Sequence, residues 1–346
     1  MRSMAGACRR HMLLCGLGFL AASLVPATRS WASDSDVGFV NWSSYHRRSP
    51  NLFAVVDALG GLVHGNGVSS VTHISTGQYE VSFTRDVGQC AYLATTENAY
   101  TQAISAFTAG GHLSSQGVYV ETKNQGGGLT DGPFHLVVVC GGNGTSFAVV
   151  GYSADLVRAS RGTTLTPLGF GRYQVKFPHR FGLFGEPCAY LATVGDPENA
   201  LVFSPSGVYT GSGPDARTVY IETKNPGGGL QDGVPFHLAV VCSSAPKTQV
   251  AVVQADGIAN RSSFFTASFT GSTGNYVVAT NRDISECATV ATRGSVDQAV
   301  PFSPATVEIT PRPAPNTVAI QVRELLFFGD DGKLLKEAFH TATFCK

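Results

Sequence analysis

A six-residue motif that recurs at an almost constant interval constrains this chain more than any other feature. The sequence Cys-Ala-Tyr-Leu-Ala-Thr begins at Cys90 and again at Cys188, and the variant Cys-Ala-Thr-Val-Ala-Thr begins at Cys287. The copies are therefore 98 and 99 residues apart. Self-similarity at a fixed period indicates a structural unit that is repeated along the chain. The sequence predicts three tandem modules of one fold.

Segments on both sides of the motif also repeat, and they set the bounds of the modules. Each unit opens with a short apolar run and closes one residue after its second cysteine. The predicted modules are residues 50–141, residues 145–243 and the divergent residues 248–346. The links between them are short, which leaves little room for independent movement. We expect the modules to touch, either around an approximate threefold axis or as a rod.

Each predicted module contains two cysteines at equivalent places, which favours pairing within the module. The expected disulfides are Cys90–Cys140, Cys188–Cys242 and Cys287–Cys345. Each would close a loop of 50 to 58 residues. Loop-closure entropy then restricts the unfolded chain by about 4 kcal/mol for each disulfide.

Composition and side-chain alternation both predict β structure. Only 14% of the residues are charged, and 40 Gly and 17 Pro interrupt short apolar runs, as is typical of loop-rich all-β proteins. Tyr79, Val81 and Phe83 share one face of their segment, which is the period of a half-buried strand. We predict an all-β fold of three antiparallel β-sandwich or jelly-roll-like modules, each with six or seven strands and one internal disulfide.

Two segments of the first module carry more specific expectations. Both faces of residues 134–140 are mostly apolar, which predicts a strand that is central or covered by a neighbouring module. Alternation along residues 118–123 predicts that Tyr119, Glu121 and Lys123 point outward. An Asp-Gly pair lies between the two segments and favours a hairpin reversal. The two strands are therefore expected to be antiparallel neighbours.

The N-terminal residues predict export. Residues 1–32 have the basic head, the apolar stretch and the small-x-small cleavage site of a signal peptide, and residues 33–49 follow as an N-terminal segment. The pair Arg9-Arg10 leaves the twin-arginine route open beside general export. We expect a secreted or periplasmic protein, with association at the cell surface as a further option.

The charge balance excludes two classes of partner from the prediction. The chain has 24 basic and 24 acidic residues, and the leader takes four arginines and no acid, which leaves 20 and 24. A mildly acidic chain without basic runs predicts no nucleic-acid partner. No segment after the leader is apolar over the length that a bilayer requires, so no membrane insertion is expected after the leader is removed.

The repeated motifs resemble a known bacterial repeat. The combination of Gly-x-Tyr-x-Val, Cys-Ala-Tyr-x-Ala-Thr and Phe-His-Leu-x-Val-x-Cys is similar to a repeat of secreted bacterial proteins to which no activity is assigned. The resemblance covers nearly all of the first two copies and part of the third. It implies export and β structure, and it implies no functional residue.

Catalytic and metal-binding chemistry has no clear carrier in the sequence. His135, His237 and His340 recur after a Phe in the last strand of each module, and we interpret them as packed or hydrogen-bonded structural residues. No HExxH spacing and no GxSxG elbow is present. We therefore predict no catalytic residue, no metal and no cofactor.

The most distinctive polar cluster is a Glu-Thr-Lys-Asn run that leads into a glycine-rich loop in the first two modules. Such groups could hydrogen-bond a sugar or, with backbone carbonyls, hold a calcium ion, but the pattern favours a surface strand end that leads into a hairpin. The candidate ligand-binding residues are Tyr119, Glu121, Lys123, Asn124, Asp131, Tyr220, Glu222, Lys224, Asn225 and Asp232. If these residues are exposed, replacing both Glu-Lys pairs by alanine should abolish binding at an unchanged melting temperature.

These observations together predict an exported, non-enzymatic repeat protein. It would act as a structural or ligand-binding array for a carbohydrate or a protein, because tandem copies multiply weak binding. The alternative is a secreted hydrolase with its site between modules, since paired carboxylates depend on distance in space rather than in sequence.

Overall fold

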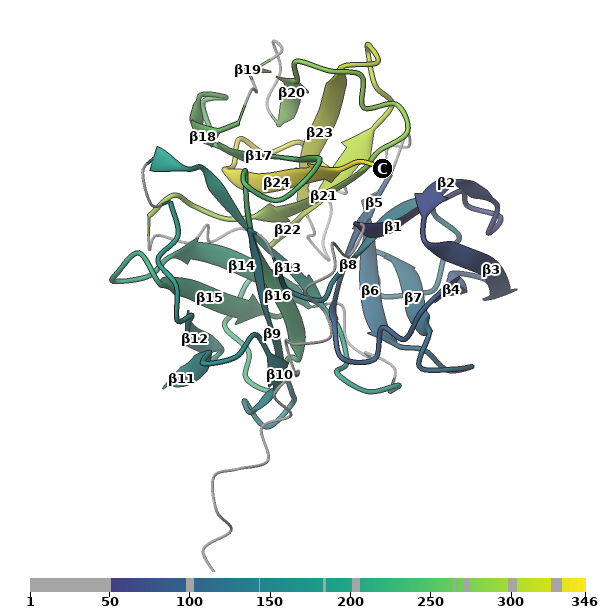
Figure 1. Ribbon diagram of the computed structural model, residues 1–346, viewed down its shortest axis with the longest axis horizontal. Helices are drawn as coiled ribbons and strands as arrows, with labels where there is room; N and C mark the ends of the chain where they lie inside the picture. The colour runs from purple at the N-terminus through teal and green to yellow at the C-terminus, as the bar shows by residue number, and fades with distance from the viewer. Residues whose placement is uncertain are drawn as a thin grey trace, which may run out of the picture. The chain divides into compact units, whose positions relative to one another are not determined.

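The structure, a computed structural model, describes residues 51–97, 103–142, 144–182, 185–200, 206–263, 266–269, 274–297, 304–324 and 332–346. The predicted signal peptide and the N-terminal segment lie outside these residues. All regular elements in the described ranges are β-strands, and they form six antiparallel sheets of four strands (Figure 1). All six sheets belong to one compact unit, Val37–Lys346.

The strands fall into three consecutive groups of eight, which we name module 1 (β1–β8), module 2 (β9–β16) and module 3 (β17–β24). Module 1 contains β1 (Leu52–Val56), β2 (Leu62–Asn66), β3 (Val68–Ser75), β4 (Gln78–Phe83), β5 (Ala91–Thr96), β6 (Ile104–Gly110), β7 (Gly117–Asn124) and β8 (Phe134–Val139). Module 2 contains β9 (Thr145–Val150), β10 (Leu156–Ala159), β11 (Thr164–Gly169), β12 (Arg172–Lys176), β13 (Cys188–Val194), β14 (Gly207–Ser212), β15 (Thr218–Lys224) and β16 (Phe236–Cys242). Module 3 contains β17 (Thr248–Val253), β18 (Ala259–Ser262), β19 (Thr266–Phe269), β20 (Asn275–Ala279), β21 (Ala288–Arg293), β22 (Ala305–Thr310), β23 (Thr317–Glu324) and β24 (Phe339–Phe344).

Each module is a sandwich of two sheets with one strand order. In module 1 the orders are β2-β1-β8-β5 and β3-β4-β7-β6, and modules 2 and 3 repeat both orders with their own strands. Apolar side chains of the two sheets meet in a core that includes Val56, Tyr79, Val81, Val120 and Phe134 in module 1. Modules 2 and 3 have equivalent cores. The predicted all-β sandwich class is confirmed.

The predicted disulfides are also confirmed. Sulfur–sulfur bonds join Cys90 to Cys140, Cys188 to Cys242 and Cys287 to Cys345. In module 2 the two cysteines lie directly opposite each other on β13 and β16. Each disulfide therefore links the strand that carries the repeated motif to the last strand of its module, which lies beside it in the same sheet.

Two expectations about the strands are wrong. Each module has eight strands in its described residues rather than six or seven, because short strands such as β2 and β10, of five and four residues, lack the apolar alternation that reveals a strand. Strands β7 and β8 are not neighbours, since β7 pairs with β4 and β6 while β8 pairs with β1 and β5. The chain turns tightly after Asn124, Leu129 pairs back onto Lys123, and only then does the chain cross to the other sheet.

The last strand of each module has two buried faces, as its sequence predicts. Phe134, Leu136 and Val138 of β8 pack into the core of module 1. Val137 and Val139, on the opposite face, join a second apolar cluster that residues of all three modules share, including Leu191 and Phe344. The modules therefore share a core of their own, which a rod of separate units would lack.

The described residues contain no helix that is long and apolar enough to cross a bilayer.

Candidate functional site

The three modules meet through strands that stand at the edges of their sheets. Strands β5, β13 and β21, which carry the repeated Cys-Ala-x-x-Ala-Thr motif, each end a four-stranded sheet. An edge strand leaves a row of backbone N–H and C=O groups unpaired. Here those groups are buried at the junction of the modules, so side chains of the neighbouring module must satisfy them.

The recurring histidines perform this task in a cyclic order. The backbone N–H of Tyr92 donates to Nδ1 of His237, and that of Tyr190 donates to Nδ1 of His340, both at 3.0 Å. The N–H of Thr289 donates to Nδ1 of His135 at 2.9 Å and closes the ring. A histidine of module 2 thus accepts a hydrogen bond from module 1, a histidine of module 3 accepts one from module 2, and a histidine of module 1 accepts one from module 3.

The tautomer of these histidines follows from the same contacts. Because Nδ1 accepts a backbone N–H, each imidazole is neutral and carries its proton on Nε2. That nitrogen donates to the backbone oxygen of Asp196 from His237 and of Ser295 from His340, and His135 meets the Glu97 carboxylate, each at 3.2 Å. Burial lowers the pKa of all three histidines, and for His340 to about 3. The reading of these residues as structural agrees with this geometry.

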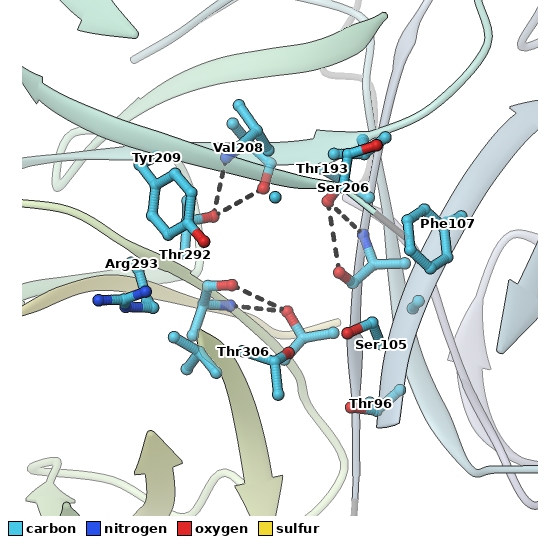
Figure 2. A pocket seen from close by; sticks show the side chains of 18 of the residues that line it. Thr96, Ser105, Phe107, Thr193, Ser206, Val208, Tyr209, Thr292, Arg293 and Thr306 are labelled. Carbon is cyan, nitrogen blue, oxygen red and sulfur yellow. Dashed lines mark hydrogen bonds between the residues drawn. The ribbon is translucent and has the colours of Figure 1, made fainter. Parts of the chain in front are cut away.

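The last threonine of the motif forms a second ring of contacts, which Figure 2 shows around a pocket. The N–H of Ala94 donates to Oγ1 of Thr193 at 3.0 Å, and the same hydroxyl donates to the Ala94 carbonyl at 3.3 Å. Thr292 holds Ala192 in this way, and Thr95 holds Ala291. One side chain thereby satisfies both backbone groups of a residue on the neighbouring edge strand.

Replacing Thr193 by Val should lower the free energy of unfolding by about 2 kcal/mol, because it leaves the N–H and C=O of Ala94 buried without partners. The two side chains have nearly the same shape, so packing changes little. Urea unfolding of the variant measures the loss. Thr193→Ser retains the hydroxyl and is the matched control; equal losses in both variants would contradict the role of the hydrogen bonds.

Among the described residues, an arginine of the neighbouring module reinforces two of the three junctions. The Arg158 side chain donates from Nε to the carbonyl of Cys90 at 2.9 Å and lies over the Tyr92 ring, and Arg261 lies over the Tyr190 ring. The junction of modules 1 and 3 has His64 at the corresponding place, with Nε2 at 3.2 Å from the carbonyl of Cys287. Burial lowers the pKa of His64.

A pocket opens where the three motifs converge (Figure 2). Its wall comes from the motif strands of all three modules and from β6, β14 and β22, and it presents hydroxyl groups such as those of Thr96, Ser105 and Thr306. Arg293 also lines the pocket, over the Tyr209 ring and paired with Glu337. The cavity volume is about 80 Å³, well below the roughly 300 Å³ at which small-molecule sites begin. This pocket is too small to be a sugar site.

The candidate ligand-binding side chains of the Glu-Thr-Lys-Asn run are mostly buried, which corrects the expectation that they point outward. Tyr119, Glu121 and Lys123 are 3%, 4% and 5% exposed. Lys123 pairs with Glu121 at 2.8 Å, and Lys224 pairs with Glu222 at 3.0 Å. Side chains of the neighbouring strands contact this face: Gln78 of β4 donates to Glu121 at 3.3 Å, and Phe107 of β6 lies under the Lys123 ammonium.

Tyrosine and aromatic neighbours complete these buried pairs. The hydroxyl of Tyr119 donates to Glu121 at 3.1 Å, and that of Tyr220 donates to Glu222 at 2.9 Å. Burial raises the pKa of Tyr220 to about 12, with Glu222 adding to the shift. The Lys123 ammonium lies over the Phe107 ring and the Lys224 ammonium over the Tyr209 ring, each at 5.1 Å.

Replacing Lys123 by Ala should lower the free energy of unfolding by about 3 kcal/mol, because it leaves the buried Glu121 carboxylate without its cation. The melting temperature should therefore fall, contrary to the expectation for an exposed pair. Calorimetry measures the change. Lys176→Ala is the matched control, since the Lys176–Asp215 pair is 53% and 43% exposed and its loss should leave the melting temperature almost unchanged.

The remaining candidates accept hydrogen bonds from the backbone of two kinds of turn, one in the glycine-rich loop and one between the first two strands of the same sheet. Oδ1 of Asn124 accepts from the Gly128 N–H, and Asn225 does the same for Gly229, both at 3.0 Å. Asp131 and Asp232 each accept from the N–H of the glycine that begins the Gly-x-Tyr element, Gly77 and Gly171, at 2.6 Å. These glycines have φ angles of 66° and 67°, a conformation that other residues rarely adopt. That hydrogen bond lowers the pKa of Asp131.

The motif threonines at the junction were not singled out from the sequence, although a signal existed. Thr95, Thr193 and Thr292 are identical in all three copies of the motif, even where Tyr and Leu change to Thr and Val in the third. The structure also brings Glu186, Cys188 and Cys242 to metal-ligand spacing among the described residues. Both sulfurs are joined in a disulfide, so neither is a thiolate ligand.

Comparison with known proteins gives no match: no family model, no curated protein and no solved structure corresponds to the chain.

Proposed function

We propose that the chain is an exported, non-enzymatic binding protein whose three modules act as one rigid body towards a carbohydrate or a protein. The observation that carries the proposal is the cyclic set of His and Thr hydrogen bonds between edge strands. Together with the shared apolar core, these contacts oppose independent movement of the modules. The chain then presents a fixed surface rather than a flexible array.

The chemistry of the junction supports a non-enzymatic role. A general base needs a free nitrogen or oxygen within reach of the proton that it removes. Both ring nitrogens of His237 and of His340 are occupied by backbone groups, and those of His135 by a backbone N–H and Glu97. Neither the histidines nor the small pocket at the junction of the modules therefore favours the alternative of a hydrolase with its site between modules.

Export is supported by the covalent structure. Three disulfides form within the chain, and such bonds persist in oxidising compartments such as the periplasm and the extracellular space. Export to one of these compartments stays part of the proposal.

The test is a binding screen of the oxidised chain from residue 33 onward, on a glycan array and against purified cell-envelope proteins, beside a panel of glycosidase and esterase substrates. We expect saturable binding to at least one glycan or protein and no turnover. The heat-denatured chain is the control for nonspecific adsorption. Turnover of a substrate would overturn the non-enzymatic role, and a complete absence of specific binding would overturn the binding role.

A further inference from the structure

A second pocket lies in module 2 alone, beside the Cys188–Cys242 disulfide. Its volume is about 720 Å³, within the range of about 300 to 1,000 Å³ that is typical of small-molecule sites. The wall includes Arg161, His179, Arg180, Phe181, Glu186 and Ser244. This cavity is large enough for a sugar, whereas the pocket at the junction is not.

The charged side chains of this pocket are mainly cationic and accessible. Arg161 and Arg180 are both exposed. Neither arginine forms an ion pair within the described ranges. Oε1 of Glu186 accepts the N–H of Ser244 at 2.7 Å, so this carboxylate is already engaged. Two guanidinium groups with free donors at one cavity suit an oxyanion, which a guanidinium can bind through two parallel hydrogen bonds.

The other two modules serve as internal references for Arg180. A backbone hydrogen bond aligns the three modules at this point: its donors are the N–H groups of Val87, Phe181 and Ile284, which bond the carbonyls of Ser115, Ala216 and Pro315. The preceding residue is Asp86 in module 1, Asp283 in module 3 and Arg180 in module 2. Both aspartates accept a backbone N–H two residues ahead. The fold therefore accommodates Asp at this place, and module 2 replaces it by the opposite charge.

The loop and the second arginine also differ from module 1. Ten residues separate Phe177 from Cys188 in module 2, whereas six separate Phe83 from Cys90 in module 1. Arg161 follows the end of β10 at the place where module 1 has Gly67. Three departures from the shared pattern thus meet at one cavity. Since the sandwich forms in module 1 without them, their presence is better explained by a ligand than by folding.

We propose that this pocket binds an acidic saccharide, with its carboxylate or sulfate group held by Arg161 and Arg180. Ser146, Ser244, Gly142 and Gly144 line the same cavity, and serine hydroxyls and backbone groups are of the kind that pair with sugar hydroxyls. This inference rests on the proposed binding function and names its ligand class.

The experiment titrates the oxidised chain from residue 33 onward with glucuronate, glucose 6-sulfate, glucose and inorganic sulfate, followed by NMR shifts and calorimetry. Two variants take the residues of module 1, Arg180→Asp and Arg161→Gly. Arg217→Ala removes an exposed arginine of module 2 outside the pocket and is the matched control. Melting temperatures establish that each variant is folded.

We expect the two acidic sugars to bind and glucose not to bind, and we expect Arg180→Asp and Arg161→Gly each to weaken binding about tenfold or more. Arg217→Ala should bind as the original chain does. If the variants bind the acidic sugars with unchanged affinity, the assignment of the site to this pocket is wrong. If inorganic sulfate alone binds, the assignment of a saccharide as the ligand is wrong. Binding of a neutral glycan or a protein that ignores both variants would overturn this inference and leave the proposed function standing.

Discussion

The free energy of unfolding should fall as the pH is lowered from 6.5 to 4.5, by up to about 1.4 kcal/mol per pH unit for each histidine of the module junction. His135, His237 and His340 are 1%, 0% and 0% exposed. Each must stay neutral to accept its backbone N–H. Burial is the largest cause of their lowered pKa values.

The sign follows from proton binding. Because the pKa values in the folded chain lie below the ordinary value of 6.5, the unfolded chain binds more protons below pH 6.5. The stabilisation is therefore complete above pH 6.5 and is lost as the pH falls towards the folded values. Three histidines acting together would give a slope of up to about 4 kcal/mol per pH unit. His135 should contribute least, since Glu97 opposes the effect of its burial.

Other groups affect this pH range only in part. His64, with a lowered pKa, adds to the loss. Glu80 acts in the opposite direction, because burial raises its pKa above 4.5. Carboxyl groups with lowered pKa values, such as Glu97 and Asp131, lose their contribution below their ordinary values of 4.5 and 3.8. The histidines therefore dominate above pH 4.5.

Urea unfolding at pH 7, 6 and 5 measures the slope. His237→Asn is the informative variant, because its amide oxygen can take the place of Nδ1 while the side chain no longer titrates. Its slope should be smaller by about one third, although its stability at pH 7 will also be lower. An unchanged slope would show that His237 is not a source of the acid sensitivity.

The architecture was accessible from the sequence because its signals are repeated. Period-two alternation at Tyr79, Val81 and Phe83 places all three in the core, and cysteines at equivalent places in each copy have the pairing that the repeat predicts. The two apolar faces of β8 pointed to contact between modules, and both faces are in fact buried. Each of these signals depends on neighbours within one strand or on comparison of the copies.

What the sequence could not supply depends on neighbours across strands. Alternation placed Tyr119, Glu121 and Lys123 on the polar face of β7, and that is the face they occupy, but whether a polar face is covered depends on β4 and β6. The same limit applies to the ring of threonine contacts, whose partners are about 100 or 196 residues away in the chain. Nothing along the chain indicates which module lies next to which edge strand.

The glycine-rich loop shows how one dipeptide can mislead. Asp131-Gly132 has the composition of a hairpin reversal, but the reversal occurs earlier, at Gly127, where φ is 78°. Asp131 instead accepts a hydrogen bond from the N–H of Gly77, in the turn between β3 and β4. A carboxylate that accepts a distant backbone N–H has the same local sequence as one that forms a turn, so the two uses cannot be told apart without the fold.

Removal of any one disulfide, with both of its cysteines replaced by Ala, should lower the free energy of unfolding by about 4 kcal/mol, because the unfolded chain regains the entropy of an open loop. The cysteines are separated by 50, 54 and 58 residues. Loop-closure entropy grows only with the logarithm of length, so the three losses should agree to within about 0.2 kcal/mol.

The comparison of the three double variants is therefore more informative than any one of them. Urea unfolding of all three without reductant measures the losses side by side. Three equal losses would place the effect in the unfolded chain. Cys188 and Cys242 lie directly opposite each other on β13 and β16. A much larger loss of stability for this pair would mean that the disulfide also stabilises the folded sheet. The reason would be that β13 carries the backbone groups that His340 and Thr292 bind, so that a looser end of β13 would also weaken the junction of modules 2 and 3.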